Sequence, residues 1–445
     1  MRILQVSHGF PPKENAGVEL YTYYLSRALA HLNHDVSLFC RGEDPEKEEF
    51  SSYEEVVDGL RVRRAINRLT RIDSHRTLYD NSFMDSLFLQ TLEQEKPDVV
   101  HFQHIFGLSG HLVRLAKGKG YPVLFTLHDF FMLCNRIQLL KRDGRLCDGP
   151  LYGLECVSCI ETLSPQDIRT RMFMRLKDVL PFPVIKWTKR FLIPPRYLEQ
   201  KGYEAFHRYR YMYEVFKACD LLLTPSHYVR NFFVRYYRSM ASKTKVLPLG
   251  VAPFGEPPYP KERNGKVRFC YFGTLFPHKG LHILIDAFKA LPKGRAALTI
   301  YGSRTPWNQD YYDQLRQQAT GFEVYFRGPY QREELPDRSK DQDVAVFPAI
   351  WPETFSIVIR EASLLGLPVI ASRIGAIPEA ITEGVNGFLF TPRDVEGLRT
   401  TMLRLLDAPI LIEEMALRMP KPKSMNEHAL EILQLYENLT TGGKR

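Results

Sequence analysis

Short apolar stretches alternate with helix-length amphipathic stretches along the whole chain, and they do so in two separate series. Near-continuous apolar strands of this kind are typical of parallel sheets whose two faces are both covered by helices. Two series therefore predict an α/β chain with two doubly wound, Rossmann-like domains. The predicted strands are Ile3–Ser7, Val36–Cys40, Asp98–Gln103, Val123–Leu127, Leu221–Thr224, Val267–Phe272, Ala297–Tyr301, Val324–Phe326, Val344–Phe347 and Val369–Ala371.

A change in composition marks the boundary between the two series. Residues 248–260 contain five prolines and two glycines in 13 positions, and such a segment cannot sustain a helix or a central strand. We therefore predict an N-terminal domain over 1–250 and a C-terminal domain over 251–424, followed by a helical segment over 425–445 that packs back on the N-terminal domain. Because doubly wound sheets bind ligands outside the carboxyl ends of their strands, we expect the two domains to face one interdomain cleft.

The excess of basic residues belongs to the first half. The chain has 60 Lys and Arg against 51 Asp and Glu, and residues 251–445 hold 24 of the basic and 23 of the acidic residues, so +8 of the net charge of +9 falls on 1–250. Two inserts interrupt the alternation there: a cysteine-rich insert over 130–165 and a basic, aromatic insert over 166–215 with a net charge of +6. Basic residues next to Trp and Phe suit an anionic membrane surface, and a solvated helical face over core aromatics is the alternative.

Several classes of protein are excluded by what the chain lacks. No apolar run approaches the roughly 20 residues of a membrane-spanning helix, and the N-terminus lacks the pattern of a signal peptide. We therefore expect a cytoplasmic protein, peripheral on the inner face of the cell membrane where the basic insert contacts lipid. A phosphate-binding Walker loop, a Gly-x-Gly turn after the first strand and a nucleic-acid-binding pattern are all missing, so we predict no nicotinamide cofactor and no nucleic-acid partner.

Four cysteines of the first insert lie within 26 residues: Cys134, Cys147, Cys156 and Cys159. The Cys-x2-Cys pair at 156 and 159 has the spacing of half a zinc site, and the other two thiols complete a set of four. Four thiolates leave no open coordination position, so we predict a structural zinc that braces this insert. Free buried thiols and a redox disulfide are the alternatives.

In the second half, charged residues follow the ends of strands. Glu353 comes after the strand that ends at Phe347, and Glu361 lies about two turns into the next helix. Backbone amides at the start of that helix suit a phosphate, and the carboxylates suit sugar and ribose hydroxyls. Lys279, after the strand that ends at Phe272, could meet a diphosphate as a point charge. Solvated surface glutamates are the alternative for isolated carboxylates, whereas the combination predicts a nucleotide-sugar site.

The order of these motifs resembles that of family 4 of the retaining glycosyltransferases, whose fold is the two-domain GT-B fold. The segment from Glu353 to Gly387, with Lys279-Gly280 upstream, carries most of the likeness. The matches in the first half, which extend the resemblance to nearly the whole chain, are Pro11–Glu19 (the glycine loop), Thr126–Asp129 (the His-Asp loop), Asp220–Ser226 and Val246–Gly250.

The resemblance implies roles for nine residues. Glu353 would hold the donor sugar, Lys279 would neutralise the leaving diphosphate, and His128 would face the sugar and the acceptor. Gly17 would let the first loop approach the diphosphate, and Glu361 would hold the ribose. The full donor-binding set that the resemblance implies is Gly17, Thr274, Phe355, Ser356, Ile357 and Glu361.

We therefore predict a retaining glycosyltransferase that moves a sugar from a nucleotide-sugar to a glycan or a lipid-linked acceptor, in cell-surface polysaccharide or lipopolysaccharide biosynthesis. The resemblance implies that catalysis needs no cofactor. Thr274 stands where many relatives have Arg, and Ser356 occupies a frequent glycine position. These departures favour, as the alternative, a non-catalytic nucleotide- or membrane-binding component of a polysaccharide assembly complex. The spacing of the motifs does not specify the donor sugar, the acceptor or the oligomeric state.

Overall fold

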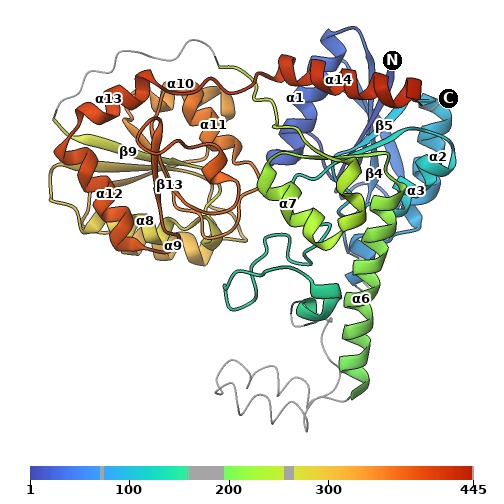
Figure 1. Ribbon diagram of the computed structural model, residues 1–445, viewed down its shortest axis with the longest axis horizontal. Coiled ribbons are helices and arrows are strands. Elements are labelled where there is room, and N and C mark those ends of the chain that lie inside the picture. The colour runs from blue at the N-terminus through green and yellow to red at the C-terminus, as the bar shows by residue number, and fades with distance from the viewer. Residues whose placement is uncertain (71–74, 158, 160–194, 255–264, 443–445) are drawn as a thin grey trace. The chain divides into compact units, whose positions relative to one another are not determined.

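The chain forms two compact units of α/β structure (Figure 1). Unit 1 comprises Met1–Thr224, Arg230–Val246 and Glu431–Arg445, and unit 2 comprises Pro225–Val229 and Leu247–Leu430. The residues described by this computed structural model are 1–70, 75–157, 159, 195–254 and 265–442.

Unit 1 contains an eight-stranded sheet with the order β3-β4-β2-β1-β5-β6-β7-β8. All neighbouring strands are parallel except β3, which pairs antiparallel with β4 at the edge. The strands are β1 (Arg2–Ser7), β2 (Asp35–Gly42), β3 (Ser52–Val57), β4 (Leu60–Ile66), β5 (Val99–Phe102), β6 (Val123–Thr126), β7 (Leu221–Thr224) and β8 (Thr244–Val246).

Most of the helices that accompany the eight-stranded sheet belong to unit 1. Two of them, α7 and α14, contain residues of both units. Their bounds are α1 (Gly17–His31), η1 (His75–Leu78), α2 (Phe83–Glu95), α3 (His111–Gly118), η2 (Leu151–Cys156), α6 (Pro195–Ala218), α7 (His227–Tyr236), η3 (Arg238–Lys243) and α14 (Met425–Gly442).

Unit 2 contains a six-stranded parallel sheet with the order β11-β10-β9-β12-β13-β14. Its strands are β9 (Val267–Phe272), β10 (Ala296–Tyr301), β11 (Val324–Gly328), β12 (Val344–Phe347), β13 (Val369–Ser372) and β14 (Gly387–Phe390). Its helices are η4 (Pro277–Lys279), α8 (Leu281–Lys289), α9 (Gln309–Gln318), η5 (Arg332–Glu334), α10 (Leu335–Ser339), α11 (Ile357–Leu364), η6 (Ile377–Glu379), α12 (Val395–Asp407) and α13 (Ile410–Leu417).

The predicted architecture of two parallel-sheet domains is confirmed, and all ten predicted strands are present. Four further strands, β3, β4, β8 and β14, were missed. Arginines at 61, 63 and 64 interrupt the apolar pattern of β4, although Arg64 is fully buried. Gly387 at the start of β14 suggests a loop by its residue type, yet an added Cβ would lie 2.1 Å from the carbonyl oxygen of Val369. Only glycine allows that close strand pairing.

The order of strands fixes where ligands can bind in each unit. In unit 1 the chain moves from β1 to β2 on one side and later reaches β5 on the other, and in unit 2 β9 is flanked in the same way by β10 and β12. The strand order reverses at these points, so the loops that follow the two central strands diverge and leave a crevice at the carboxyl edge. The relevant loops follow β1 and β5 in unit 1, and β9 and β12 in unit 2.

Part of the basic, aromatic insert lies outside the described residues. Residues 160–194 are not described, and residues 195–215 belong to α6. Within the described part of the chain, no helix combines the length and the apolar character that a membrane span requires.

Candidate functional site

Lys279 and Glu353 are in contact in unit 2. Lys279 ends η4 in the loop after β9, and Glu353 lies in the loop between β12 and α11. The Lys279 Nζ atom is 2.7 Å from Glu353 Oε1, and both side chains are largely but not completely buried. Strand order thus brings together two residues that are 74 positions apart, at the crevice of the unit 2 sheet.

A tryptophan and a glycine hold the Glu353 loop in place. The indole Nε1 of Trp351 donates to Glu353 Oε1 at 2.9 Å, and the Lys279 ammonium lies 4.9 Å from the centre of the Trp351 ring. Gly375 has a positive φ of 61°, and a Cβ there would lie 2.4 Å from the carbonyl oxygen of Glu353. The Glu353 carboxylate is therefore fixed by a cation, an indole and a close backbone contact.

Glu361 is buried on α11 and has a partner that the sequence did not suggest. Arg332 Nε donates to Glu361 Oε1 at 2.6 Å, and the Arg332 guanidinium lies 4.1 Å from the centre of the Phe254 ring. Burial raises the pKa of the Glu361 carboxyl above its ordinary value, and the Arg332 charge and hydrogen bond oppose that rise. No motif marked Arg332, although β11 ends at Gly328 and the loop that follows it begins with Pro329.

The start of α11 has the features of an anion site. Its N-cap residue, Ser356, makes no side-chain capping hydrogen bond, and no acidic residue lies in the first turn, which begins at Ile357. Ser356 has left-handed backbone angles (φ 59°, ψ 74°), a conformation that glycine adopts more easily. Phe355 is buried, and the guanidinium of Arg360 lies 4.0 Å from the centre of the Phe355 ring. Burial lowers the pKa of Arg360 to about 10.

Thr274 is exposed in the loop after β9, and its carbonyl oxygen accepts a hydrogen bond of 2.8 Å from the Tyr271 hydroxyl. Arg373, which follows β13, pairs with Glu383 at 3.1 Å, and its side chain is 57% exposed. Besides Lys279, a second cation contacts a predicted site carboxylate: Arg332, through Glu361.

In unit 1, two histidine–carboxylate pairs are formed by residues of the loops after β1, β5 and β6 and by Glu19 of α1. His8 Nε2 is 3.0 Å from Glu19 Oε1, His104 Nε2 is 3.3 Å from Asp129 Oδ2, and the rings of the two histidines are 4.2 Å apart. Burial opposes the ionisation of both carboxyls, but their histidine partners outweigh it, so the pKa values of Glu19 and Asp129 lie below their ordinary values. The second oxygen of Glu19, Oε2, is buried without a hydrogen-bond partner.

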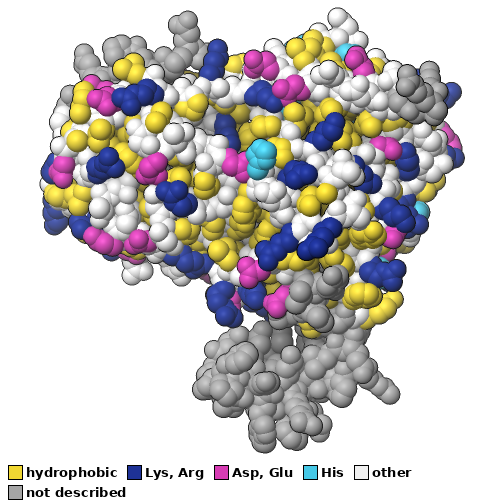
Figure 2. All heavy atoms as spheres, in the orientation of Figure 1, with side chains coloured by type: hydrophobic (Ala, Val, Ile, Leu, Met, Phe, Trp, Pro, Cys, Tyr) yellow, Lys and Arg dark blue, Asp and Glu magenta, His cyan; other side chains and the backbone are white. Residues whose placement is uncertain are grey.

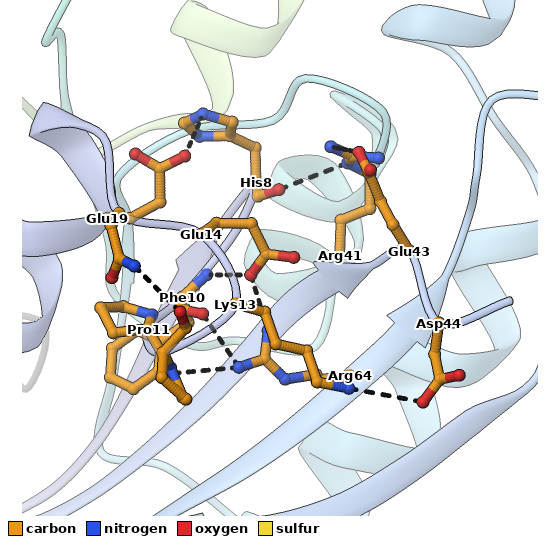
Figure 3. A network of polar contacts seen from close by, with 12 residues as sticks. His8, Phe10, Pro11, Lys13, Glu14, Glu19, Arg41, Glu43, Asp44 and Arg64 are labelled. Atoms are coloured by element: carbon orange, nitrogen blue, oxygen red, sulfur yellow. Dashed lines mark hydrogen bonds and ion pairs between the residues drawn. The ribbon is translucent and has the colours of Figure 1, made fainter. Parts of the chain in front are cut away.

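A buried arginine anchors the loop that carries these groups (Figure 3). Arg64 Nη1 donates to Glu14 Oε2 at 2.8 Å, and its Nη2 donates to the carbonyl oxygens of Phe10 and Pro11 at 2.9 and 3.0 Å. Gly17 follows this anchored segment at the first position of α1, where it is exposed and has open space where a Cβ would be. The backbone at Gly17 is thus accessible to a ligand.

His128 lies in the loop after β6 and is 8% exposed. Its Nε2 atom is 2.7 Å from Gln103 Oε1, and its ring packs 4.8 Å from the ring of Tyr21. Gln103 follows β5 and is completely buried. His128 is therefore held at the same carboxyl edge of the unit 1 sheet as the two histidine–carboxylate pairs.

The four cysteines of the insert line one small cavity in unit 1, between η2 and the loop that follows β6. All four are free thiols, and burial raises the pKa of Cys156 to about 12. Among the described residues, no group of three or more His, Cys, Asp or Glu side chains has the arrangement of a metal site. Zinc binding by Cys134, Cys147, Cys156 and Cys159 stays a prediction.

Two groups of predicted site residues come together within their own units. Lys279, Glu353 and the start of α11 meet in unit 2, and the loops of Gly17 and His128 lie at one edge of the unit 1 sheet. The sequence did not identify Arg332 or Gln103 as site residues. Buried polar residues in or just after apolar strands, such as Gln103, were a signal that could have been used.

Comparisons with known proteins were made against families, curated sequences and solved structures. The model of "Glycosyltransferase Family 4" matches residues 15–149, and that of "Glycosyl transferases group 1" matches residues 257–423, so together they span more than half of the chain.

Full-length similarity extends to several individual proteins. The chain is 27% identical over 444 residues to a glycogen synthase of Mycobacterium tuberculosis, covering 94% of this chain and 88% of that protein. The structure matches sucrose-phosphate synthase from Thermosynechococcus elongatus with a TM-score of 0.69 at 18% identity, covering 99% of this chain and 100% of that one. It also matches the Anabaena protein HepE, solved in complex with UDP and glucose, with a TM-score of 0.62 at 17% identity, covering 98% and 99% of the two chains.

Proposed function

Because the chain belongs to the group 1 glycosyltransferases and has their GT-B fold, we propose that it transfers a sugar, with retention of configuration, from a nucleotide-sugar to a glycan or lipid-linked acceptor. The observation that carries this proposal is the Lys279–Glu353 pair at the crevice of the unit 2 sheet, 2.7 Å long and next to the uncapped start of α11. A cation, a fixed carboxylate and helix amides are the groups that a diphosphate-linked sugar requires.

Each group has a distinct role in this proposal. Lys279 and the amides at the start of α11 stabilise the negative charge that grows on the leaving diphosphate. Glu353 accepts hydrogen bonds from hydroxyls of the donor sugar, and Glu361 accepts them from the ribose. Burial and the contact with Arg332 keep Glu361 in one orientation, which positions the nucleotide before reaction.

Retention follows if the acceptor hydroxyl attacks the same face of the sugar that the diphosphate leaves. The bond between the anomeric carbon and the diphosphate oxygen breaks with its electron pair staying on that oxygen, and a new bond forms from the acceptor oxygen to the anomeric carbon. The acceptor proton passes to the departing diphosphate oxygen. His128 and the two histidine–carboxylate pairs of unit 1 provide polar groups for the hydroxyls of the acceptor.

A groove of about 550 Å³ in unit 1 supports an anionic or lipid-linked acceptor. Its lining has three arginines and no acidic residue, and four tyrosines complete most of its wall. On the face drawn in Figure 2, by comparison, basic and acidic side chains are interspersed. The residues that line the groove are Tyr209, Arg210, Tyr213, Arg235, Tyr236, Tyr237, Arg238 and Ser239.

One relative is named as a glycogen synthase, and glycogen is a polymeric glycan. This similarity supports a growing glycan as the acceptor and a place in polysaccharide or lipopolysaccharide biosynthesis. A cationic groove, partly lined by Tyr209, Arg210 and Tyr213 of the basic insert, supports work at the inner face of a membrane, where anionic headgroups attract arginine.

A thermal-shift screen of nucleoside diphosphates and nucleotide-sugars tests the donor. A ligand at 100 times its Kd should stabilise the protein by about 2.7 kcal/mol, so the correct nucleotide will raise Tm measurably. The best donor is then incubated with glycan and lipid-linked acceptors, and the anomeric configuration of the product is read by NMR. An inverted product would contradict retention, and the absence of a Tm shift with every nucleotide would contradict the proposed donor site.

A further inference from the structure

The sheet of unit 1 carries polar side chains where a parallel sheet normally carries apolar ones. Gln5 on β1 and His101 on β5 are register partners, so their side chains lie on the same face, and both are completely buried. Thr126, at the end of β6, is 1% exposed on the same side, since its hydroxyl contacts His101. Buried polar groups cost free energy unless they are hydrogen-bonded, so this cluster requires partners.

The partner that completes the cluster comes from the other end of the chain. Tyr436 of α14 is completely buried, and its hydroxyl is 2.7 Å from His101 Nδ1 and 3.2 Å from Gln5 Nε2. The portion of α14 that contains Tyr436 belongs to unit 1 and lies over its sheet (Figure 1). Gln5 Oε1 accepts from Gln103 Nε2 at 2.9 Å, and Gln103 Oε1 is the atom that His128 Nε2 contacts at 2.7 Å. Gln103 Nε2 also lies 3.2 Å from each ring nitrogen of His101.

The directions of these hydrogen bonds are consistent along the chain of contacts. An amide oxygen only accepts, so Gln103 Oε1 requires a proton on His128 Nε2. The Gln103 amide nitrogen then donates to Gln5 Oε1, and the Gln5 amide nitrogen donates to the Tyr436 oxygen. Tyr436 in turn donates to His101 Nδ1, whose ring therefore carries its proton on Nε2 and donates it to Thr126 Oγ1 at 2.7 Å.

Tyr436 determines the direction of these hydrogen bonds because its hydroxyl contacts both Gln5 and His101. It accepts one hydrogen bond and donates another, and burial raises its pKa, which keeps the hydroxyl protonated. Without the hydroxyl, the Gln5 amide nitrogen would lose its acceptor and Gln5 could turn over. Its NH2 group would then face the NH2 group of Gln103, which favours a turn of Gln103 as well, against the contacts of 3.2 Å between Gln103 Nε2 and the ring nitrogens of His101. A turned Gln103 would present its NH2 group to His128 and favour the opposite tautomer, in which Nε2 accepts.

We propose that Tyr436, on the C-terminal helix, is a positioning residue that holds His128 in its Nε2-protonated tautomer and in a fixed orientation, acting through Gln5 and Gln103. The consequence for activity rests on the proposed function, in which His128 faces the sugar and the acceptor. The effect on the tautomer does not depend on that role.

The variant Tyr436→Phe tests the proposal because it removes one hydroxyl and keeps the ring. The protein is labelled with ¹⁵N-histidine, and the ¹⁵N shifts of the neutral imidazoles report which nitrogen carries the proton. The His128 signal is assigned by its loss in His128→Gln. The matched control is Tyr311→Phe, which removes a tyrosine hydroxyl 2.8 Å from His282 Nδ1 in unit 2.

The expected result is a single Nε2-protonated form of His128 in the wild-type protein and in Tyr311→Phe, and a mixture of tautomers in Tyr436→Phe. An unchanged His128 tautomer in Tyr436→Phe would overturn the proposal. Transfer assays form a separate arm: kcat should fall about tenfold in Tyr436→Phe with the donor KM unchanged, as expected for the loss of one buried hydrogen bond. Full activity of His128→Gln would count against the proposed role of His128 and leave the tautomer result as it stands.

Discussion

The two units hold their site residues by different kinds of interaction. In unit 2 the carboxylates of Glu353 and Glu361 are each paired with a cation, Lys279 and Arg332, at 2.7 and 2.6 Å. In unit 1 the carboxylates of Glu19 and Asp129 are paired with imidazoles, and His128 contacts the neutral amide of Gln103, which in turn contacts Gln5. Unit 2 therefore pairs its site carboxylates with permanent cations, which suit a charged diphosphate donor, whereas unit 1 pairs its site carboxylates with imidazoles, whose proton position can change and which suit hydroxyls of an acceptor.

The largest effect is expected from breaking the first ion pair of unit 2. Glu353→Ala should lower kcat by about 100-fold or more, because it removes a group that contacts the donor sugar and releases Lys279 from its position. Steady-state transfer kinetics and Tm measure the two effects. The control Glu383→Ala removes an exposed carboxylate paired with Arg373 and should leave kcat unchanged. Wild-type activity in Glu353→Ala would refute the assigned role.

The second ion pair should matter more for stability. Arg332→Ala leaves Glu361 buried without its cation, and breaking a buried pair typically costs about 3 kcal/mol. The free energy of unfolding from denaturant titration measures this cost, and donor KM should rise as the ribose contact loosens. Arg338→Ala, which removes a cation from a more exposed pair with Glu334, is the control and should cost less than about 1 kcal/mol. Equal costs in the two variants would show that burial does not distinguish these pairs.

In unit 1 the exposed arginines of the groove test the contribution of surface charge, in contrast to the ion pairs of unit 2. Replacing Arg210, Arg235 and Arg238 by Gln removes the cations of the tyrosine-lined groove. At about 1 kcal/mol per basic residue, binding to vesicles of anionic phospholipid should weaken at least tenfold. Co-sedimentation measures the change, and neutral vesicles serve as the control. Equal binding of the wild-type protein to anionic and neutral vesicles would remove the membrane hypothesis.

A metal in the cysteine-lined cavity would add a cation held by thiolates to unit 1 and so reduce the difference in charge between the two units. We predict about one zinc per chain after gentle purification, because four thiolates are a complete ligand set for zinc. Elemental analysis measures the content, and Cys156→Ser should lose the metal whereas Cys219→Ser, a buried cysteine outside the cavity, should keep it. Protein that contains no zinc would contradict the prediction.

The smallest effect concerns pH and unit 2. Burial lowers the pKa of His278 and of His428 to about 3, from an ordinary value of 6.5. The unfolded chain therefore binds protons before the folded protein does, so the contribution of these residues is complete above pH 6.5 and declines as the pH falls from there toward 3. Tm should fall between pH 7.5 and 5.5, and the slope should be shallower in His428→Asn than in His31→Gln, which changes an exposed residue. Equal slopes in the two variants would contradict the assignment to His428.

The fold could be predicted from the sequence wherever the strands are purely apolar. In β12, for example, all four residues are apolar and buried, so the sequence alone predicts this strand. Strand β4 was missed because Arg64 is a charged residue that is completely buried, and its burial depends on Glu14 and on two carbonyl oxygens some 50 residues away. The pattern of residue types along a strand does not show whether a charged side chain will be paired with groups that are distant in the sequence.

The candidate site likewise contains residues that the sequence predicted and residues that it did not. Lys279 and Glu353 each follow a strand and carry a recognisable motif, so their proximity follows from strand order alone. Arg332 has no motif, and only the folding of the loop after β11 brings it to Glu361.

The sequence by itself determined the two parallel-sheet units and the family, because hydrophobic periodicity and motif spacing are local properties of the chain. Tertiary structure decided which charges are paired and which way hydrogen bonds run. Tyr436 shows the reason: it is 335 residues from His101 and 431 from Gln5, and nothing in its neighbourhood in the sequence distinguishes it from any other buried tyrosine of a helix. Its partners exist only once the C-terminal helix lies on the sheet.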